Sequence, residues 1–233
     1  MIFDLKIYFL LFLIYSFVGW VLEVIYTLFT DKKLTNRGFF IGPYCPIYGV
    51  GALLVVVFLS KFQQHPFALF ILAVVICSVL EYCTSYVMEK IFKIRWWDYS
   101  NNKFNINGRI CLETMIPFGV IACLLIYVIN PFLVLNLNKL PESFLMVISL
   151  VFGVLLLADY ITSFNIINNF KKTVKKASEL DRTDDVNRYV RKVLFEKSFL
   201  YRRLIKAFPL IQNKLMNIKS VKKIKKIGKN KKD

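Results

Sequence analysis

Long apolar stretches, each about the length needed to cross a bilayer as a helix, occupy most of the first 164 residues. A helix rises ~1.5 Å per residue, so about 20 apolar residues span the ~30 Å hydrocarbon core of a membrane. Five stretches approach this length, at about 5–29, 43–60, 66–90, 111–130 and 143–164. The sequence therefore predicts an all-α polytopic membrane helix bundle with about five transmembrane helices.

The charge of the chain changes abruptly after the last of these stretches. Residues 1–164 hold 11 basic and 9 acidic side chains, whereas residues 165–233 hold 21 basic and 6 acidic ones. We therefore predict two parts, a transmembrane domain at 1–164 and a basic helical cytoplasmic tail at 165–233.

Apolar residues of the tail recur at three- and four-residue intervals among basic ones, which is typical of an amphipathic helix. Val186, Val190, Leu194 and Leu204 belong to this apolar stripe. Basic amphipathic helices bind the anionic phospholipids of an inner leaflet, so the bilayer and these lipids are the predicted partners. Nucleic acid is the rival ligand of a lysine-rich end, but a membrane tether disfavours it. A docking helix for a cytosolic partner is a third interpretation.

Basic residues concentrate in alternate connecting segments, and this orients the predicted bundle. Lys32, Lys33 and Arg37 follow the first stretch, and five basic residues lie between 90 and 110. The other connecting segments carry one basic residue each. By the positive-inside rule, the N-terminus lies outside and the tail lies in the cytoplasm. The N-terminus and the tail can lie on opposite sides of the membrane only if the number of spans is odd.

The first four stretches resemble two copies of one helix pair. The Val-Leu-Glu sequence at 21–23 recurs at 79–81, and Tyr-Gly-Val at 48–50 matches Phe-Gly-Val at 118–120. Both copies begin on the same side, so this pattern predicts a parallel two-helix repeat. Chance similarity between apolar helices is the alternative. The Gly-Pro-Tyr-Cys-Pro sequence at 42–46 predicts an irregular or re-entrant start of the second span.

Charged residues inside apolar spans cost about 2.5–3.5 kcal/mol on insertion scales, so each marks a candidate site. Five acids (Glu23, Glu81, Glu89, Glu113 and Asp159) fall in the inner half of the predicted bundle, with basic and aromatic residues at the same level. We predict an inward-facing polar pocket for a substrate, an ion or a lipid headgroup. The alternative is a set of structural ion pairs that lock the helix ends. The candidate site residues are Glu23, Arg37, Glu81, Arg95, Trp96, Trp97, Asp98, Tyr99, Arg109 and Glu113.

Motifs of several enzyme classes are absent from the sequence. It contains no P-loop, no serine-hydrolase elbow and no metal-binding spacing of cysteine and histidine. His65 is its sole histidine, and its five cysteines lie in or beside apolar segments, where they predict small buried hydrophobes. We therefore predict no cofactor, no metal site and no catalytic residue, and we favour a protein that is not itself an enzyme.

Four segments carry distinctive sequences: SFVGWVLEVIY (16–26), NRGFFIGPYCPIYGVGA (36–52), LEYCTSYVMEKIF (80–92) and RWWDYSNNKFNINGRICLE (95–113). In combination they resemble a bacterial membrane family of ABC-transporter permeases, type IV. The resemblance implies a multi-pass protein of the bacterial cytoplasmic membrane, which acts as a permease-like subunit together with a separate ATPase. An inner-leaflet enzyme that binds or modifies lipid, and a membrane scaffold that transports nothing, are the alternatives.

Overall fold

A computed structural model of the chain describes residues 4–32, 36, 38, 40–92 and 95–179. Its helices are α1 (Leu5–Asp31), α2 (Pro46–Leu59), α3 (Pro66–Phe92), α4 (Leu112–Leu124), α5 (Asn130–Leu137) and α6 (Glu142–Glu179). A 3₁₀ turn, η1 (Ser60–Phe62), follows α2, and a π-helical segment, η2 (Leu125–Ile129), joins α4 to α5. Two short strands, β1 (Asn105–Ile106) and β2 (Ile110–Cys111), pair antiparallel. We call these strands, together with the segment that leads into them from residue 95, the hairpin (95–111). The predicted all-α membrane bundle is confirmed.

Four helical segments in the described part of the chain are long and apolar enough to cross a membrane. They are Leu5–Phe29, Pro66–Phe92, Leu112–Leu137 and Glu142–Asn169. The second predicted span is a shorter apolar helix, Pro46–Phe62, which reaches only ~25 Å at the usual helical rise. The count of five spans therefore stays a prediction.

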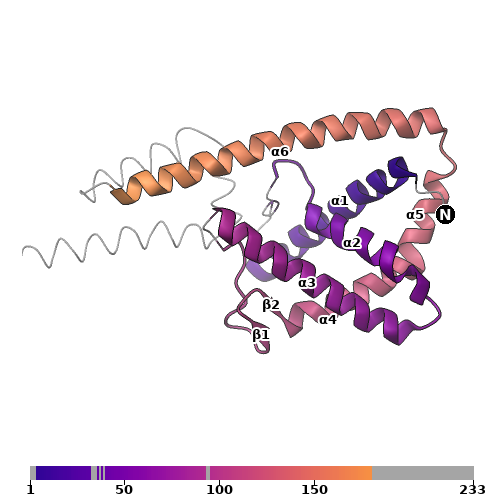
Figure 1. Cartoon of the computed structure of the whole chain (residues 1–233), viewed down its shortest axis with the longest axis horizontal. Coiled ribbons are helices and arrows are strands. Elements are labelled where there is room, and N and C mark those ends of the chain that lie inside the picture. The colour runs from indigo at the N-terminus through magenta and orange to yellow at the C-terminus, as the bar shows by residue number, and fades with distance from the viewer. Residues whose placement is uncertain (1–3, 33–35, 37, 39, 93–94, 180–233) are drawn as a thin grey trace, which may run out of the picture.

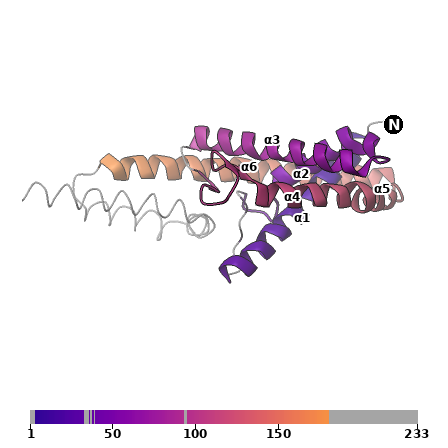
Figure 2. The ribbon, with the colours of Figure 1, turned by 90° about the horizontal axis from the view of Figure 1, so that it is seen from below.

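The helices alternate in direction between two ends of the bundle. In Figure 1, α1, α3 and α6 run toward the end that carries the β1–β2 hairpin, whereas α2 and α4–α5 run back from it. Figure 2 shows that α1 crosses the other helices obliquely. As a result, the connections after α1 and after α3 share one end, and the connections at 63–65 and 138–141 share the other.

The start of α2 is irregular, as the Gly-Pro-Tyr-Cys-Pro sequence predicts. Residues 40–45 are not helical, and α2 begins at Pro46, a residue suited to the first helical turn because it lacks an N–H group. The backbone N–H of Cys45 donates to the carbonyl oxygen of Ser16 in α1 at 2.9 Å. Irregular backbone is tolerated in a membrane where protein satisfies its polar groups, and α1 does so here.

Two glycines allow the helices of each predicted repeat unit to approach closely. A Cβ atom on Gly49 would lie 2.6 Å from the carbonyl oxygen of Phe12, and one on Gly119 would lie 2.7 Å from the Phe70 ring. Phe12 and Phe70 stand 58 positions apart, which is also the interval between the two Val-Leu-Glu sequences. Equivalent residues thus make equivalent contacts in α1–α2 and α3–α4, which supports the repeat.

An aliphatic core joins these four helices and η2. Leu11, Val55, Leu69 and Ile126 are almost fully buried in it. The π-helical η2 comes just before Pro131, whose missing N–H removes one ordinary helical hydrogen bond. The helix nevertheless continues through Pro131, so the fourth span extends past the predicted end at 130 to Leu137.

The last helix, α6, lies along the outside of the bundle and contacts α1 and α3 (Figure 1). It starts at Glu142 and continues without a break to Glu179, past the domain boundary predicted at 164. That boundary stays a prediction, and the remainder of the predicted tail, residues 180–233, lies outside the described residues.

Candidate functional site

A stripe of polar residues runs along α3 and organises the hairpin end of the bundle. Its members recur at three- and four-residue intervals, which places them on one face of a helix. Three of them, Ser78, Glu81 and Ser85, are buried. The stripe consists of Ser78, Glu81, Tyr82, Ser85, Tyr86 and Glu89.

Arg109 docks the hairpin on this stripe. Its guanidinium group forms an ion pair with Glu89 at 2.8 Å and donates a hydrogen bond to the Ser85 hydroxyl at 3.1 Å. It also lies over the rings of Tyr82 and Tyr86, at 5.7 and 5.3 Å from their centroids. Because Arg109 is only 9% exposed and contacts a carboxylate, a hydroxyl and two rings, its charge is already neutralised within the protein.

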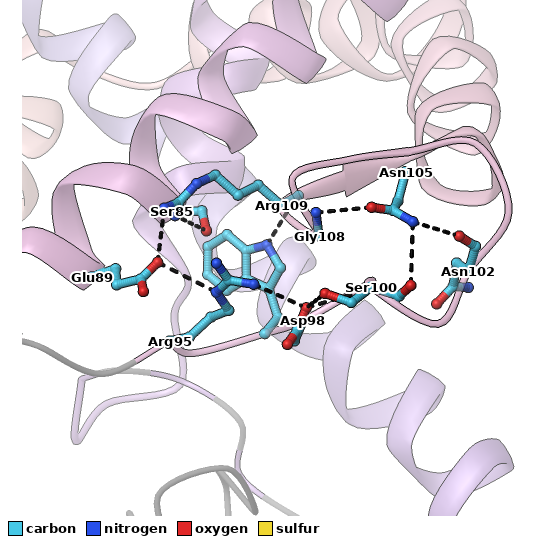
Figure 3. Close-up of polar contacts among 10 residues, drawn as sticks. Ser85, Glu89, Arg95, Asp98, Ser100, Asn102, Asn105, Gly108 and Arg109 are labelled. Atoms are coloured by element: carbon cyan, nitrogen blue, oxygen red, sulfur yellow. Dashed lines mark hydrogen bonds and ion pairs between the residues drawn. The ribbon is translucent and has the colours of Figure 1, made fainter.

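Arg95 forms a second, more exposed pair of contacts with acids. It reaches Glu89 at 3.3 Å and Asp98 at 3.1 Å, so Glu89 bridges both arginines of the hairpin (Figure 3). Desolvation opposes the charge of Arg95, but these two carboxylates outweigh it and raise the pKa of the guanidinium. Burial likewise opposes ionisation of Asp98, yet hydrogen bonds from Ser100 and the charge of Arg95 hold the pKa of this carboxyl below its ordinary value of 3.8.

The segment from 95 to 111 is further ordered by hydrogen bonds of its own (Figure 3). Asn105 accepts a bond from the Gly108 N–H at 2.9 Å and donates to the Asn102 carbonyl at 2.8 Å. The indole of Trp97 donates to the Arg109 carbonyl at 3.0 Å. Asn107 and Gly108 both have positive φ, the combination that tight two-residue hairpin turns require. This segment therefore has a defined fold that its own hydrogen bonds stabilise.

Two intramembrane carboxylates lie behind the hairpin, each bonded to a tyrosine hydroxyl. Tyr48 of α2 donates to Glu23 at 2.7 Å, and Tyr99 of the hairpin donates to Glu81 at 3.2 Å. Burial raises the pKa of Tyr99, so its hydroxyl remains a donor. Glu23 also acts electrostatically on Glu81, and Tyr99 on Tyr48. These four residues, which we call the carboxylate–tyrosine cluster, thus combine α1, α2, α3 and the hairpin.

Polar atoms without a partner are also present near this cluster. Glu81 is 7% exposed, and its second carboxylate oxygen, Oε2, has no hydrogen-bond partner among the described residues. Ser78, one turn earlier on the same face of α3, is 5% exposed, and its hydroxyl also lacks a partner in the part of the chain that the structure describes. Buried polar groups of this kind are rare because each costs about 1–3 kcal/mol, so they require an explanation.

A third acid, Asp159 of α6, has a different role from the other two. It accepts bonds from the N–H groups of Ile41 and Gly42 at 3.0 and 2.7 Å, and from the hydroxyls of Tyr44 and Ser163 at 2.5 and 2.7 Å. Four donors saturate the carboxylate, which therefore anchors the irregular start of α2 to α6.

Most of the predicted site residues fall into two groups in the structure, and the others belong to neither group. Arg95, Trp97, Asp98 and Arg109 form the hairpin network, and Glu23, Glu81 and Tyr99 belong to the carboxylate–tyrosine cluster. Trp96 is buried edge-on against Phe92. Glu113 is exposed and accepts a bond from Asn102 at 2.6 Å, so it belongs to neither group. Arg37 lies outside the described residues.

Sequence reasoning missed several residues that complete these groups. Tyr48, Ser78, Tyr82, Ser85 and Tyr86 are absent from the predicted set, and Glu89 was recognised as an acid but not as a site residue. For α3, the three- and four-residue spacing of its polar side chains was the available signal. The Asn-Gly pair at 107–108 was the available signal for the hairpin.

The cluster has the composition of a site for a small polar or cationic ligand. Carboxylate and hydroxyl oxygens accept hydrogen bonds and attract positive charge, and burial strengthens both effects. Among the described residues, no group of three or more histidine, cysteine or acidic side chains could hold a metal ion.

Comparison with known proteins identifies a family. Residues 10–164 match the family described as Putative ABC-transporter type IV. No curated protein and no solved structure matches the chain. The matched region contains α1 from residue 10 onward, α2 to α5, the hairpin, the carboxylate–tyrosine cluster and α6 up to residue 164. Because this region covers well over half of the sequence, the chain belongs to the Putative ABC-transporter type IV family.

Proposed function

We propose that the protein is the membrane-spanning, permease-like subunit of an ABC-type transporter and that the carboxylate–tyrosine cluster is its polar site. The observation that carries this proposal is the cluster itself. Glu23 and Glu81 occupy matching positions of the two repeat units, and both lie within the apolar spans. Polar groups at such depth are expensive, and proteins keep them chiefly along the pathways of substrates and ions.

A separate ATPase is the partner that this function requires, because the sequence contains no P-loop. The hairpin end of the bundle is the surface we propose for that contact. Phe104, near the hairpin turn, has a positive φ and is 78% exposed, which presents an aromatic side chain beyond the ordered network. In the proposed orientation this end faces the cytoplasm, where ATP is available, and the N-terminus faces outward.

Binding or modification of a lipid headgroup receives less support than transport. Anionic headgroups are bound by unpaired cations, but Arg95 and Arg109 are already paired with acids of the protein. Anionic lipids remain the proposed partners of the basic tail, outside the described residues.

Purification of the full-length protein from its native membrane tests the proposal. We expect a P-loop ATPase to co-purify in a fixed stoichiometry. We also expect ATP hydrolysis by the complex to fall at least tenfold in Glu23→Gln. Glu142→Gln makes the same chemical change at the opposite end of the bundle, at a side chain that is 83% exposed, and is the matched control. Bound phospholipid without any ATPase, or equal hydrolysis in all variants, would contradict the proposal.

A further inference from the structure

Within the carboxylate–tyrosine cluster, Glu81 differs from the other acids of the bundle in how it is satisfied. Glu89 binds two arginines, and Asp159 accepts four hydrogen bonds. Glu81 accepts only one bond, from the Tyr99 hydroxyl at 3.2 Å, and forms no ion pair with any described residue. One oxygen of its carboxyl group therefore lacks the hydrogen bonds or ion pair that a buried charge requires.

Among the described residues, the groups that act on Glu81 add no positive charge. Glu23 acts on Glu81 from α1 and Tyr99 from the hairpin, while Cys77 lies one turn away on α3. Cys45 acts on Tyr48, and Cys111 acts on Tyr99. The described arginines of the hairpin are turned to Glu89. A second carboxylate that acts on Glu81 makes it harder still for both acids to be ionised in a medium of low dielectric constant.

On these grounds we propose that Glu81 is a proton-binding residue of the transport cycle. In the conformation described here its carboxyl group carries a bound proton, and it releases that proton when a conformational change brings it into contact with water. This inference rests on the proposed transport function, because only an alternation between conformations gives the proton a role.

A proton fits the surroundings of Glu81 better than other cations do. A metal ion would need several ligands, and the described residues bring together no group of three histidine, cysteine or acidic side chains. A proton needs no cavity, only a carboxyl oxygen without a partner, and Oε2 is such an atom. The Ser78 hydroxyl, one turn away on the same face, is a potential acceptor for the O–H of the acid after a change of rotamer.

Infrared difference spectroscopy of the purified full-length protein in phosphatidylcholine vesicles tests this proposal. We expect a carboxylic-acid C=O band at neutral pH in the wild type. The band should disappear in Glu81→Gln and remain in Glu142→Gln, which alters an exposed carboxylate. In Tyr99→Phe, which removes one hydroxyl and keeps the ring, the band should remain and move to higher frequency because Oε1 loses its hydrogen bond.

Three outcomes would overturn the assignment. They are an unchanged band in Glu81→Gln, no shift of the band in Tyr99→Phe, and a band that responds to replacement of Na⁺ by choline at constant pH, which would indicate a metal cation. Because the measurement needs neither ATP nor a partner, it can succeed even if no ATPase co-purifies. The proton site and the transporter function can thus fail separately.

Discussion

At Arg109, one guanidinium group connects the hairpin to α3 through an acid, a hydroxyl and two aromatic rings. Lysine would keep the charge but could not reproduce the planar fork that allows these contacts together. The residue thus joins two elements of the bundle instead of offering a free charge to a ligand.

We expect Arg109→Ala to destabilise the protein by roughly 2 kcal/mol. Breaking a fully buried ion pair costs about 3–5 kcal/mol, and the partial exposure of Glu89 reduces that figure. Thermal unfolding of the purified protein in detergent measures the change. Lys103→Ala, at an exposed position of the same hairpin, is the control, and equal stability of the two variants would contradict our account of Arg109.

The acids near the hairpin end of the bundle could be located along their helices from the sequence, but their partners could not. Depth follows from the distance along a helix, so the positions of Glu23 and Glu81 were predictable. Arg109 pairs with Glu89 and not with Glu81 because of the rotation of α3 about its axis and the turn at Asn107. Only the folded chain defines these two features. For the same reason, the role of Asp159 as an anchor for Gly42 was invisible in the sequence.

Among the helices, α1–α2 and α3–α4 depend on close contact at glycine. We expect Gly49→Ala and Gly119→Ala to destabilise the bundle by about 1–3 kcal/mol each, since overpacking forces side chains or backbone to shift. Gly49→Ala should be the worse of the two because its new methyl group meets the Phe12 carbonyl, whereas at Gly119 it meets side chains that can move.

Gly153→Ala is the matched control for these two substitutions. It lies within α6, and its Cβ would make an ordinary contact of 3.8 Å with Phe9. Thermal unfolding should leave this variant at or slightly above wild-type stability, because alanine favours helix over glycine. If all three variants behaved alike, close approach at Gly49 and Gly119 would not be what holds the pairs together.

The irregular start of α2 should loosen when Asp159 is changed to asparagine. An amide offers one acceptor oxygen in place of two and turns an NH₂ group toward the donors of Gly42 and Tyr44. We expect the reaction of buried Cys45 with a membrane-permeant maleimide to become several-fold faster. Exposed Cys83 provides the internal reference, and an unchanged ratio of the two rates would contradict the anchoring role.

At the scale of the whole molecule, the alternating helices determine which connections share a side, whereas the assignment of that side to the cytoplasm rests on charge. We expect a cysteine placed at position 103 to be protected from an impermeant reagent in intact cells, and a cysteine placed at position 139 to be labelled. Both positions are exposed lysines, one between α3 and β1 and the other between α5 and α6. The reverse labelling pattern would invert the proposed orientation.

The unbroken length of α6 has a mechanical consequence. A helix of 38 residues is a rod of ~57 Å, and a rod that is attached near its middle converts a push at one end into rotation about the attachment. Asp159 is such a pivot, because it ties the rod to the backbone of Ile41 and Gly42 just ahead of α2. A force applied near Glu179 would therefore be delivered to the start of α2, two residues from the tyrosine that binds Glu23.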